Sequence, residues 1–284
     1  MSIELKNVSY KYENAGSNHT GRLILDDINL TISKEQFTAI IGATGSGKST
    51  LIQHFNKLII ASSGEVSYNG KNIYDKEFNA KRLRADIGLV FQYPEYQLFE
   101  ADVFSDVCFG PKNLGLDQEE VEERAIQALA AVGIEESDFK RSPFELSGGQ
   151  KRRVAIAGVL AMKPKYLVLD EPAAGLDPKG KRDLLGIIKA LHENNGIGVV
   201  LVSHSMDDVA SYADRIVVLN KGKIIFDDEP KKVFTHRNEL EKIGLGVPQA
   251  TLVADKLREK GWDIPEELTT IKEVADAIAK ARGK

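Results

Sequence analysis

One short segment constrains the fold of this chain more than any other. GATGSGKS, Gly42 to Ser49, follows the apolar run Phe37–Ile41 and precedes a helical pattern over Ser49–Leu58. Glycines allow successive backbone N–H groups to turn inward around phosphate oxygens, and a helix N-terminus adds its positive end. We expect Lys48 to reach the β- and γ-phosphates and the Ser49 hydroxyl to hold Mg²⁺. The segment therefore predicts a nucleoside triphosphate site in a strand–loop–helix unit.

The alternative is a glycine turn that contains Lys-Ser by coincidence. From average residue usage, the bare pattern should arise in roughly one chain in a hundred of this size. The strand before it and the helix after it make coincidence a poor explanation. The residues expected to contact ATP in this segment are Gly42, Ala43, Thr44, Gly45, Ser46, Gly47, Lys48, Ser49 and Thr50.

Composition and charge narrow the class of protein further. The chain has 284 residues, 42% hydrophobic and 28% charged, which is typical of a soluble globular protein with a sizeable core. A formal net charge of −4 gives no basic field for nucleic acid. The single cysteine, Cys108, excludes an internal disulfide and suits a reducing cytosol. No run approaches a membrane span and the N-terminus lacks a signal-peptide core, so we expect any membrane role to run through a partner.

The hydrophobic pattern predicts an α/β fold. Apolar runs at Phe37–Ile41, Ile87–Val90, Tyr166–Leu169 and Val199–Val202 alternate with helical segments, as parallel strands buried on both faces do. The dipeptide Asn69-Gly70 between short strand patterns predicts a hairpin turn. We therefore expect a mixed sheet that carries the phosphate-binding loop.

Two regions depart from this alternation. A helical stretch spans about 93–162, and within it Asp117 with Glu120 three residues later predicts a capping box. After about residue 238, Pro248–Lys260 and Thr270–Ala281 read as two short amphipathic helices. We predict a main domain at 1–237 with the helical stretch as an inserted subdomain, and a small helical domain at 238–284.

A second motif, YLVLDEP, supplies two adjacent carboxylates. An apolar strand delivers Asp170 to its carboxyl end, the edge at which an open α/β sheet places ligands. We expect Asp170 to face the magnesium shell and Glu171 to point at the attacking water, because hydrolysis needs metal positioning and water activation at different points. The alternative interpretation is a strand that ends in two solvated acids. The phosphate-binding loop in the same chain makes this alternative less favoured.

A third motif, LSGGQKRRVAIAGVLA, opens a long helix with Ser147, Gly148 and Gly149. These residues form a second helix N-terminus that can bind an anion. One subunit binds only a single triphosphate, which the phosphate-binding loop already holds. The simplest resolution is that these residues, with Gln150 beside them, bind the γ-phosphate held by another subunit.

With these three motifs in order, the chain resembles the nucleotide-binding subunit of an ATP-binding-cassette (ABC) transporter over about residues 1–235. The resemblance implies that Tyr12 stacks on adenine, although it could simply pack on its strand. Gln92 matches the glutamine loop, which contributes to Mg²⁺ binding and catalysis. Asp177 ends the segment Ala174–Asp177 that matches the D-loop of the dimer, and His204 matches the switch histidine that contacts the γ-phosphate.

The remaining histidines and one basic run are predicted to have structural roles. His19, His54, His192 and His236 lack any such context and are expected to be structural. The basic run Lys151-Arg152-Arg153 is expected to form a solvated helix face or subunit contacts. A DNA-binding reading of this run is disfavoured by the acidic chain.

The stretch FQYPEYQLFE, Phe91 to Glu100, resembles the extra segment that marks the ATPases of energy-coupling factor (ECF) transporters, the vitamin and metal importers. The second, A′-type ATPase of such a transporter is matched better than the first by YPEYQLF, Phe109–Asn113, LSGGQKRRVAIAGVLAMKP and DEPAAGLDP. The resemblance also implies that the C-terminal helical domain helps to hold two ATPase subunits together. The acids and aromatics of FQYPEYQLFE predict a docking groove for a helix of the membrane subunit, lined by Glu95, Tyr96 and Glu100, while Leu98 and Phe99 are expected to pack into the subdomain core.

The resemblance implies ATP hydrolysis that drives micronutrient uptake, with Glu171 as general base. It further implies a heterodimer with a related A-type ATPase, a transmembrane T component and a substrate-binding S component, with the ATPases peripheral on the cytoplasmic side of the cell membrane. Two alternatives remain: a dedicated cobalt or nickel importer with two copies of one ATPase, and a soluble ABC protein of DNA repair or translation. The second normally has long coiled coils or two cassettes, whereas only about 90 residues separate the first and third motifs here.

Overall fold

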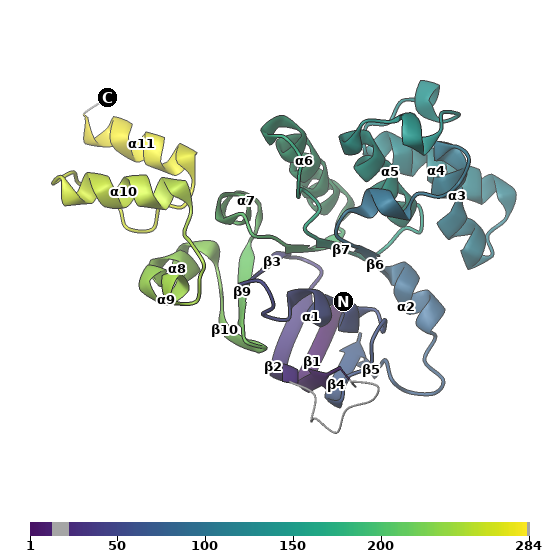
Figure 1. The fold of residues 1–284 in the computed structure, drawn as a ribbon, viewed down its shortest axis with the longest axis horizontal. Helices are drawn as coiled ribbons and strands as arrows, with labels where there is room; N and C mark the ends of the chain where they lie inside the picture. Colours follow the sequence, from purple (N-terminus) through teal and green to yellow (C-terminus); the bar gives the residue numbers. More distant parts are fainter. Residues whose placement is uncertain (13–22, 283–284) are drawn as a thin grey trace.

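The computed structural model describes residues 1–12 and 23–282, and His19 lies outside them. Two sheets form the centre of the molecule (Figure 1). The larger has six strands in the order β10-β9-β3-β8-β7-β6. Its strands are β3 (Phe37–Ile41), β6 (Ile87–Val90), β7 (Tyr166–Asp170), β8 (Gly198–Val202), β9 (Arg215–Asn220) and β10 (Lys223–Asp228).

The five strands from β9 to β6 run parallel, and β10 joins the edge antiparallel to β9. Every residue of β3, β7 and β8 is buried, as expected for parallel strands covered on both faces. The predicted α/β fold is therefore confirmed.

The smaller sheet is antiparallel with the order β2-β1-β4-β5. Its strands are β1 (Ser2–Lys11), β2 (Leu23–Ser33), β4 (Ser63–Tyr68) and β5 (Lys71–Asn72). Asn69 and Gly70 join β4 to β5 with φ of 52° and 75°, so both central residues take the left-handed conformation of a type I′ turn. The hairpin predicted from this dipeptide is confirmed.

Helix α1 (Lys48–Phe55) lies between the two sheets. Its buried side chains Leu51, Ile52 and Phe55 share one hydrophobic cluster with strands of both. The helix that follows the phosphate-binding loop is thus fixed from two sides. The other helices around the large sheet are α2 (Ala80–Asp86), α6 (Pro178–Asn195) and α7 (Met206–Tyr212).

The segment between β6 and β7 is helical within the predicted bounds of about 93–162. Its elements are η1 (Pro94–Gln97), α3 (Val103–Leu114), α4 (Gln118–Ala131), η2 (Glu136–Asp138), η3 (Pro143–Glu145) and α5 (Gly148–Leu160). Asp117 accepts a hydrogen bond from the Glu120 N–H at 2.9 Å. The Glu120 carboxylate pairs with Arg124 instead of returning to the cap, so only half of the predicted capping box forms.

The C-terminal part contains α8 (Pro230–Thr235), α9 (Arg237–Lys242), α10 (Gln249–Glu259) and α11 (Ile271–Ala281). Leu240, Leu245 and Val247 pack in one cluster with residues of β3 and β9. A separate small core starts only at Ala250 and joins α10 to α11, which lie together at one end of the molecule (Figure 1). Within the described residues, no helix has the length and apolarity to cross a lipid bilayer.

Candidate active site

The order of the large sheet gathers the predicted site residues at one edge. Because β3, β8, β7 and β6 are parallel neighbours, the segments that follow them leave from the same side. These segments are the phosphate-binding loop after β3, His204 after β8, Glu171 after β7 and Gln92 after β6. Four segments far apart in the sequence therefore leave the sheet at the same edge.

Lys48 is held inside its own loop. Its Nζ atom donates to the Gly42 carbonyl at 2.7 Å and to the Ala43 carbonyl at 3.1 Å, and the residue is 7% exposed. Burial lowers the pKa of Lys48, opposed by the nearby carboxyls of Glu171 and Asp170. An ammonium group has three N–H donors, so one remains after these two bonds for a further acceptor such as a phosphate oxygen.

Two glycines of the loop are required by the chain around it. A Cβ at Gly42 would lie 2.2 Å from the Leu219 carbonyl oxygen, and one at Gly47, where φ is 107°, would lie 2.9 Å from the Ile24 carbonyl oxygen. The Ser46 hydroxyl is buried and has no hydrogen-bond partner within the described chain. A tight cradle with a free donor and a buried ammonium suits a phosphate group.

Asp170 and Ser49 supply the oxygens expected for a divalent cation. Asp170 is 6% exposed, and its burial raises its pKa, opposed by the Ser49 hydroxyl and by Lys48. Carboxylate and hydroxyl oxygens suit Mg²⁺, which usually also takes oxygens from substrate phosphates. No group of three or more His, Cys, Asp or Glu among the described residues could hold a metal by itself. The donor set thus fits a cation shared with a nucleotide.

Glu171 and His204 face each other across the site. The Oε1 atom of Glu171 lies 3.2 Å from Nε2 of His204 but has no well-aligned hydrogen bond. Burial first, and the Asp170 charge second, raise the pKa of Glu171 to about 7. Burial lowers the pKa of His204, so its imidazole is neutral at pH 7. A carboxyl that titrates near pH 7 is well matched to proton abstraction from water.

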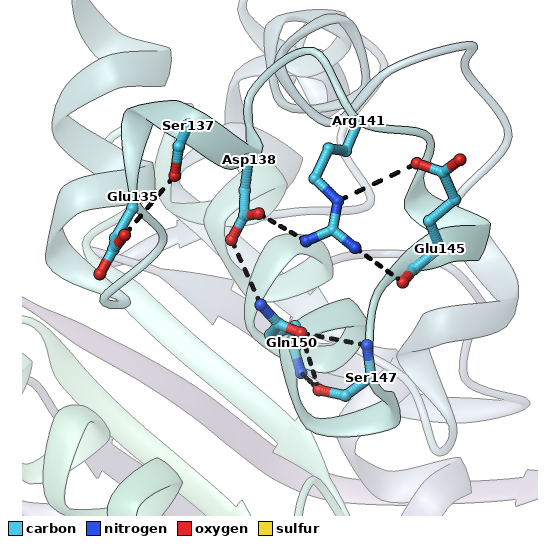
Figure 2. A network of polar contacts seen from close by, with 7 residues as sticks. All are labelled: Glu135, Ser137, Asp138, Arg141, Glu145, Ser147 and Gln150. Atoms are coloured by element: carbon cyan, nitrogen blue, oxygen red, sulfur yellow. Dashed lines mark hydrogen bonds and ion pairs between the residues drawn. The ribbon is translucent and has the colours of Figure 1, made fainter.

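Ser147 caps helix α5 through a reciprocal pair of bonds with Gln150 (Figure 2). The Ser147 hydroxyl accepts from the Gln150 N–H at 3.3 Å, and the Gln150 Oε1 atom accepts from the Ser147 N–H at 3.1 Å and from its hydroxyl at 2.9 Å. The sequence Ser-Gly-Gly-Gln thus forms a capping box that presents the N-terminus of α5.

Figure 2 also shows what holds Gln150 in place. Its Nε2 atom donates to Asp138 Oδ2 at 3.2 Å, and Arg141 Nη1 lies 2.7 Å from Asp138 Oδ1. Arg141 in turn donates to the Glu145 carbonyl at 3.0 Å. The segment before α5 therefore fixes the orientation of the Gln150 amide, a connection that the sequence did not suggest.

The packing of this subunit leaves room for a side chain at both glycines after Ser147. A Cβ at Gly148 would have nothing within 4 Å, and one at Gly149 would only touch Leu176 at 3.9 Å. Neither glycine has a positive φ. Their small size is therefore not explained by the packing of this chain, unlike that of Gly42 and Gly47.

Three residues assigned through the resemblance lie on accessible surface. Tyr12 is 47% exposed, and its hydroxyl lies 3.3 Å from Thr50 Oγ1, beside the phosphate-binding loop. Gln92 is exposed at the start of the segment after β6. Asp177 is exposed and caps α6 by accepting from the Gly180 N–H at 2.7 Å.

The segment Phe91–Glu100 lies against α5 rather than free in solvent. Glu95 forms a bidentate ion pair with Arg152, with distances of 2.7 and 3.2 Å. Arg152 is only 3% exposed, so the expectation of a solvated basic face is wrong at this position: its charge is buried against a carboxylate. Tyr96, by contrast, is 85% exposed.

The two apolar residues of this segment differ in burial. Leu98 is 7% exposed and joins the subdomain core, as expected. Phe99 is 57% exposed, so its expected burial is wrong. Its ring meets that of Phe109 edge-on at 4.8 Å, and both line a groove of about 490 Å³ together with Met162. Phe109 belongs to α3 and Met162 to the turn after α5, so no local sequence pattern indicates that they meet Phe99.

Two further residues near the site were not foreseen. Lys181 Nζ, at the start of α6, lies 2.6 Å from Asp208 Oδ2 and 3.1 Å from the Ser205 hydroxyl. These contacts tie the segment after Asp177 to the segment after His204. A pair 27 positions apart has no periodic signal that would reveal it.

The other described histidines, His54, His192 and His236, make contacts within the fold. The Nδ1 atom of His54 contacts the Thr50 carbonyl at 2.8 Å, and that of His192 contacts the Ile197 carbonyl at 2.8 Å. His236 stacks on Phe226 with ring centroids 4.5 Å apart.

Comparison with known proteins shows which family the chain resembles. Residues 25–174 match the family model described as ABC transporter. The chain is 53% identical to the energy-coupling factor transporter ATP-binding protein EcfA2 of Caldanaerobacter subterraneus subsp. tengcongensis, covering 99% of this chain and 97% of that one. It is 48% identical to the protein of the same name from Clostridium perfringens, covering 98% and 97%.

Solved structures give the same result. The structure of cbiO1 from Clostridium perfringens, part of the ABC transporter complex cbiONQ, superposes with a TM-score of 0.73 at 38% identity, covering 85% of this chain and 93% of that one. A dimeric ATP-binding cassette, MJ0796 bound to ADP and Pi, superposes with a TM-score of 0.70 at 30% identity, covering 80% and 98%.

Proposed function

This chain belongs to the ATP-binding subunits of energy-coupling factor transporters, a branch of the ABC transporter family, and we propose the roles of its individual residues and partners on that premise. Its activity is ATP hydrolysis coupled to transport. The observation that carries the residue assignment is the meeting of Lys48, Asp170, Glu171 and His204 at one edge of the parallel sheet.

We propose that Glu171 acts as the general base. Its carboxyl, with a pKa of about 7, takes a proton from the water that attacks the γ-phosphorus in line with the leaving group. His204, whose Nε2 atom lies 3.2 Å from this carboxyl, is neutral and has a single N–H, which would donate to the γ-phosphate. Lys48 and the loop N–H groups bind the β- and γ-phosphates, where negative charge shifts during the reaction.

Ser49, Asp170 and Gln92 would hold Mg²⁺, which supplies charge neutralisation at the phosphate oxygens when it is bound. The buried carboxyl of Asp170 and its contact with the Ser49 hydroxyl support this assignment. Asp170 contacts the Ser49 hydroxyl and lies near Lys48, so it would help to hold the cation, whereas Glu171 would activate the water.

We propose that Ser147, Gly148, Gly149 and Gln150 complete the site of a partner ATPase. The open space beyond the Gly148 Cα supports this, because glycine is useful where another molecule approaches the backbone closely. The MJ0796 cassette with ADP and Pi is a dimer, and the relatives named EcfA2 favour a second, related ATPase as partner. Asp177 would lie at this contact, and Tyr12 beside the adenine.

The groove beside Phe99 is the proposed docking site for a helix of the transmembrane T component, with a substrate-binding S component completing the importer at the cytoplasmic face of the membrane. Its apolar lining from Phe99, Phe109 and Met162 offers buried area, and Lys81, Arg84 and Asp106 place both signs of charge around it. Exposed aromatics beside charged rims are typical of interface anchors. The residues predicted from the sequence to line the docking groove, Glu95, Tyr96 and Glu100, are not among those that line this one.

A charge reversal at Glu95 does not test docking, because a lysine there would place two positive charges together at Arg152. We expect Phe99→Asp to weaken co-purification of the membrane subunits with the ATPase pair by about tenfold or more, the scale of a lost interface anchor. Ile60→Asp is the control, because Ile60 is 62% exposed outside the groove. ATP affinity should not change in either variant. Full recovery of the membrane subunits by Phe99→Asp would refute the groove assignment.

Identity with the curated relatives also bears on the substrate. The chain is 53% identical to an EcfA2 protein and 38% identical to cbiO1. The name EcfA2 of the relatives implies a first, related ATPase, which favours an importer with two different ATPases over a dedicated cobalt or nickel importer with two copies of one. Co-purification of two different ATPases with one T component would establish the shared type, whereas two copies of this chain on the T component would indicate the dedicated type.

A further inference from the structure

Arg152 makes an unusual set of contacts for a residue beside the signature segment. Its Nε and Nη2 atoms bind both carboxylate oxygens of Glu95, at 3.2 and 2.7 Å. Its Nη1 atom donates to the carbonyls of Pro172 and Ala174, at 2.9 and 2.6 Å. Four contacts therefore occupy a guanidinium group that has five N–H donors.

These contacts join three parts of the molecule that are distant in the sequence. Arg152 belongs to α5, whose N-terminus is Ser147 and Gly148. Glu95 belongs to η1, in the segment that borders the proposed docking groove. Pro172 and Ala174 follow Glu171 directly. One side chain thus connects the surface for the partner ATPase, the surface for the membrane subunit and the loop of the general base.

The burial of this arrangement gives it rigidity. The Arg152 side chain is 4% exposed and that of Glu95 is 17% exposed. Loss of either partner would leave a charge in a poorly solvated place, so both positions are strongly constrained. Bidentate pairing also fixes orientation, which a single ammonium contact does not.

The loop after Glu171 needs such support. Glu171 has a φ of 50°, a conformation that costs a non-glycine residue free energy and persists only where its surroundings enforce it. Within the loop, the Ala174 N–H bonds the Glu171 carbonyl at 3.1 Å. Arg152, which lies outside the loop, donates to the carbonyl of Pro172, one residue beyond Glu171, and to the carbonyl of Ala174.

We infer that Arg152 is a positioning residue for ATP hydrolysis, which holds the loop after Glu171 in place and ties that loop, through Glu95, to the segment that borders the docking groove. The link to the groove rests on the docking function proposed above. The link to the Glu171 loop does not, because it concerns contacts within this chain. Docking of a membrane subunit would then reach the general base through Glu95 and Arg152.

The first test measures steady-state hydrolysis by the ATPase pair without membrane subunits. Arg152→Met should lower kcat by about 10- to 100-fold, the scale of a misplaced reacting group, and leave KM for ATP within about twofold, because the phosphate-binding loop is untouched. Arg152→Lys should recover part of kcat, since an ammonium reaches some of the four acceptors but cannot pair bidentately.

Arg215 provides a matched control. It also binds a carboxylate with two nitrogens, Asp227 at 2.6 Å twice, and donates to the Thr31 carbonyl at 2.7 Å, but it lies at the start of β9, away from the site edge. Arg215→Met should lower the melting temperature without the selective loss of kcat. If Arg152→Met and Arg215→Met lower kcat equally, or if soluble Arg152→Lys keeps the full wild-type kcat, Arg152 is only structural and the inference fails.

The second test measures coupling in the assembled transporter. The readout for Glu95→Gln is the ratio of hydrolysis with and without membrane subunits, alongside the amount of membrane subunit recovered. The inference predicts normal recovery with a ratio at least about threefold below wild type, the scale of one weakened charge-assisted contact. Loss of recovery would place Glu95 in docking itself and remove it from the link. An unchanged ratio with normal recovery would overturn the link to the groove while leaving docking intact.

Discussion

Glu171 Oε1 and His204 Nε2 lie 3.2 Å apart, although the two residues come from segments after different strands. The pKa of Glu171 is raised to about 7 by its burial and by Asp170, while burial lowers the pKa of His204. The pair therefore consists of a carboxyl that loses its proton near neutrality and an imidazole that is already neutral. A general base must be able to lose its proton at the working pH, and a neutral imidazole beside it can still donate one hydrogen bond.

Hydrolysis should depend on pH through Glu171. A base works only when deprotonated, so kcat/KM should rise as pH increases through the raised pKa of about 7 and should fall below it. Burial lowers the pKa of His204, so this imidazole is neutral at pH 7 and above and does not reduce the rate there. The measurement is kcat/KM of the ATPase pair from about pH 5.5 to 8.5. A kcat/KM profile that stays flat down to about pH 5.5 would contradict a raised pKa at the base.

Glu171→Gln should separate binding from chemistry. The amide keeps the shape of the side chain but cannot accept the proton, so hydrolysis should fall by roughly 10²–10⁴-fold. Binding of ATP with Mg²⁺ should remain, since Lys48, Ser49 and Asp170 are unchanged. Single-turnover hydrolysis and equilibrium nucleotide binding test the two halves. Turnover near the wild-type rate in the assembled complex would remove Glu171 from the role of base.

Gly148→Asp should damage the partner's site but not this subunit's own. A carboxylate at the start of α5 would lie where the partner's γ-phosphate is expected, and like charges repel strongly in a partly desolvated site. ATP-driven association of the two ATPases should weaken while isolated chains bind ATP normally. Gly186→Asp is the control, because Gly186 is also an exposed helical glycine with open space around it. Loss of ATP affinity in isolated Gly148→Asp chains would mean that the signature acts within its own subunit.

Asp138→Ala should weaken the same shared site indirectly. Gln150 and Arg141 both lose their acceptor, so the Gln150 amide is free to turn away from Ser147. Hydrolysis by the ATPase pair should fall by about 2- to 10-fold, corresponding to one hydrogen bond of about 0.5–1.5 kcal/mol. Asp117→Ala removes a helix cap of the same subdomain without touching Ser147 and should not reduce turnover. Equal loss in both variants would reduce the Asp138 effect to general destabilisation.

The sequence by itself determined the fold class and the chemical parts of the site. Apolar runs such as Phe37–Ile41 predicted buried parallel strands because those strands are covered on both faces. The phosphate-binding loop, the pair Asp170-Glu171 and the Ser147–Gln150 motif were readable because each depends on neighbouring residues within one turn or one strand end. The turn at Asn69-Gly70 was readable for the same reason, since it depends on local backbone conformation.

Tertiary structure decided what these parts contact. Arg152 looked solvated in a basic run, yet it pairs with Glu95, 57 positions earlier, because α5 packs against η1. Phe99 was expected to be buried, yet its side chain is exposed and lines a groove together with Phe109 of α3. The raised pKa of Glu171 depends on burial and on Asp170, and its contact with His204 depends on β7 and β8 being neighbours. Contacts between distant segments have no local pattern in the sequence, because only the packing of the elements determines which side chains meet.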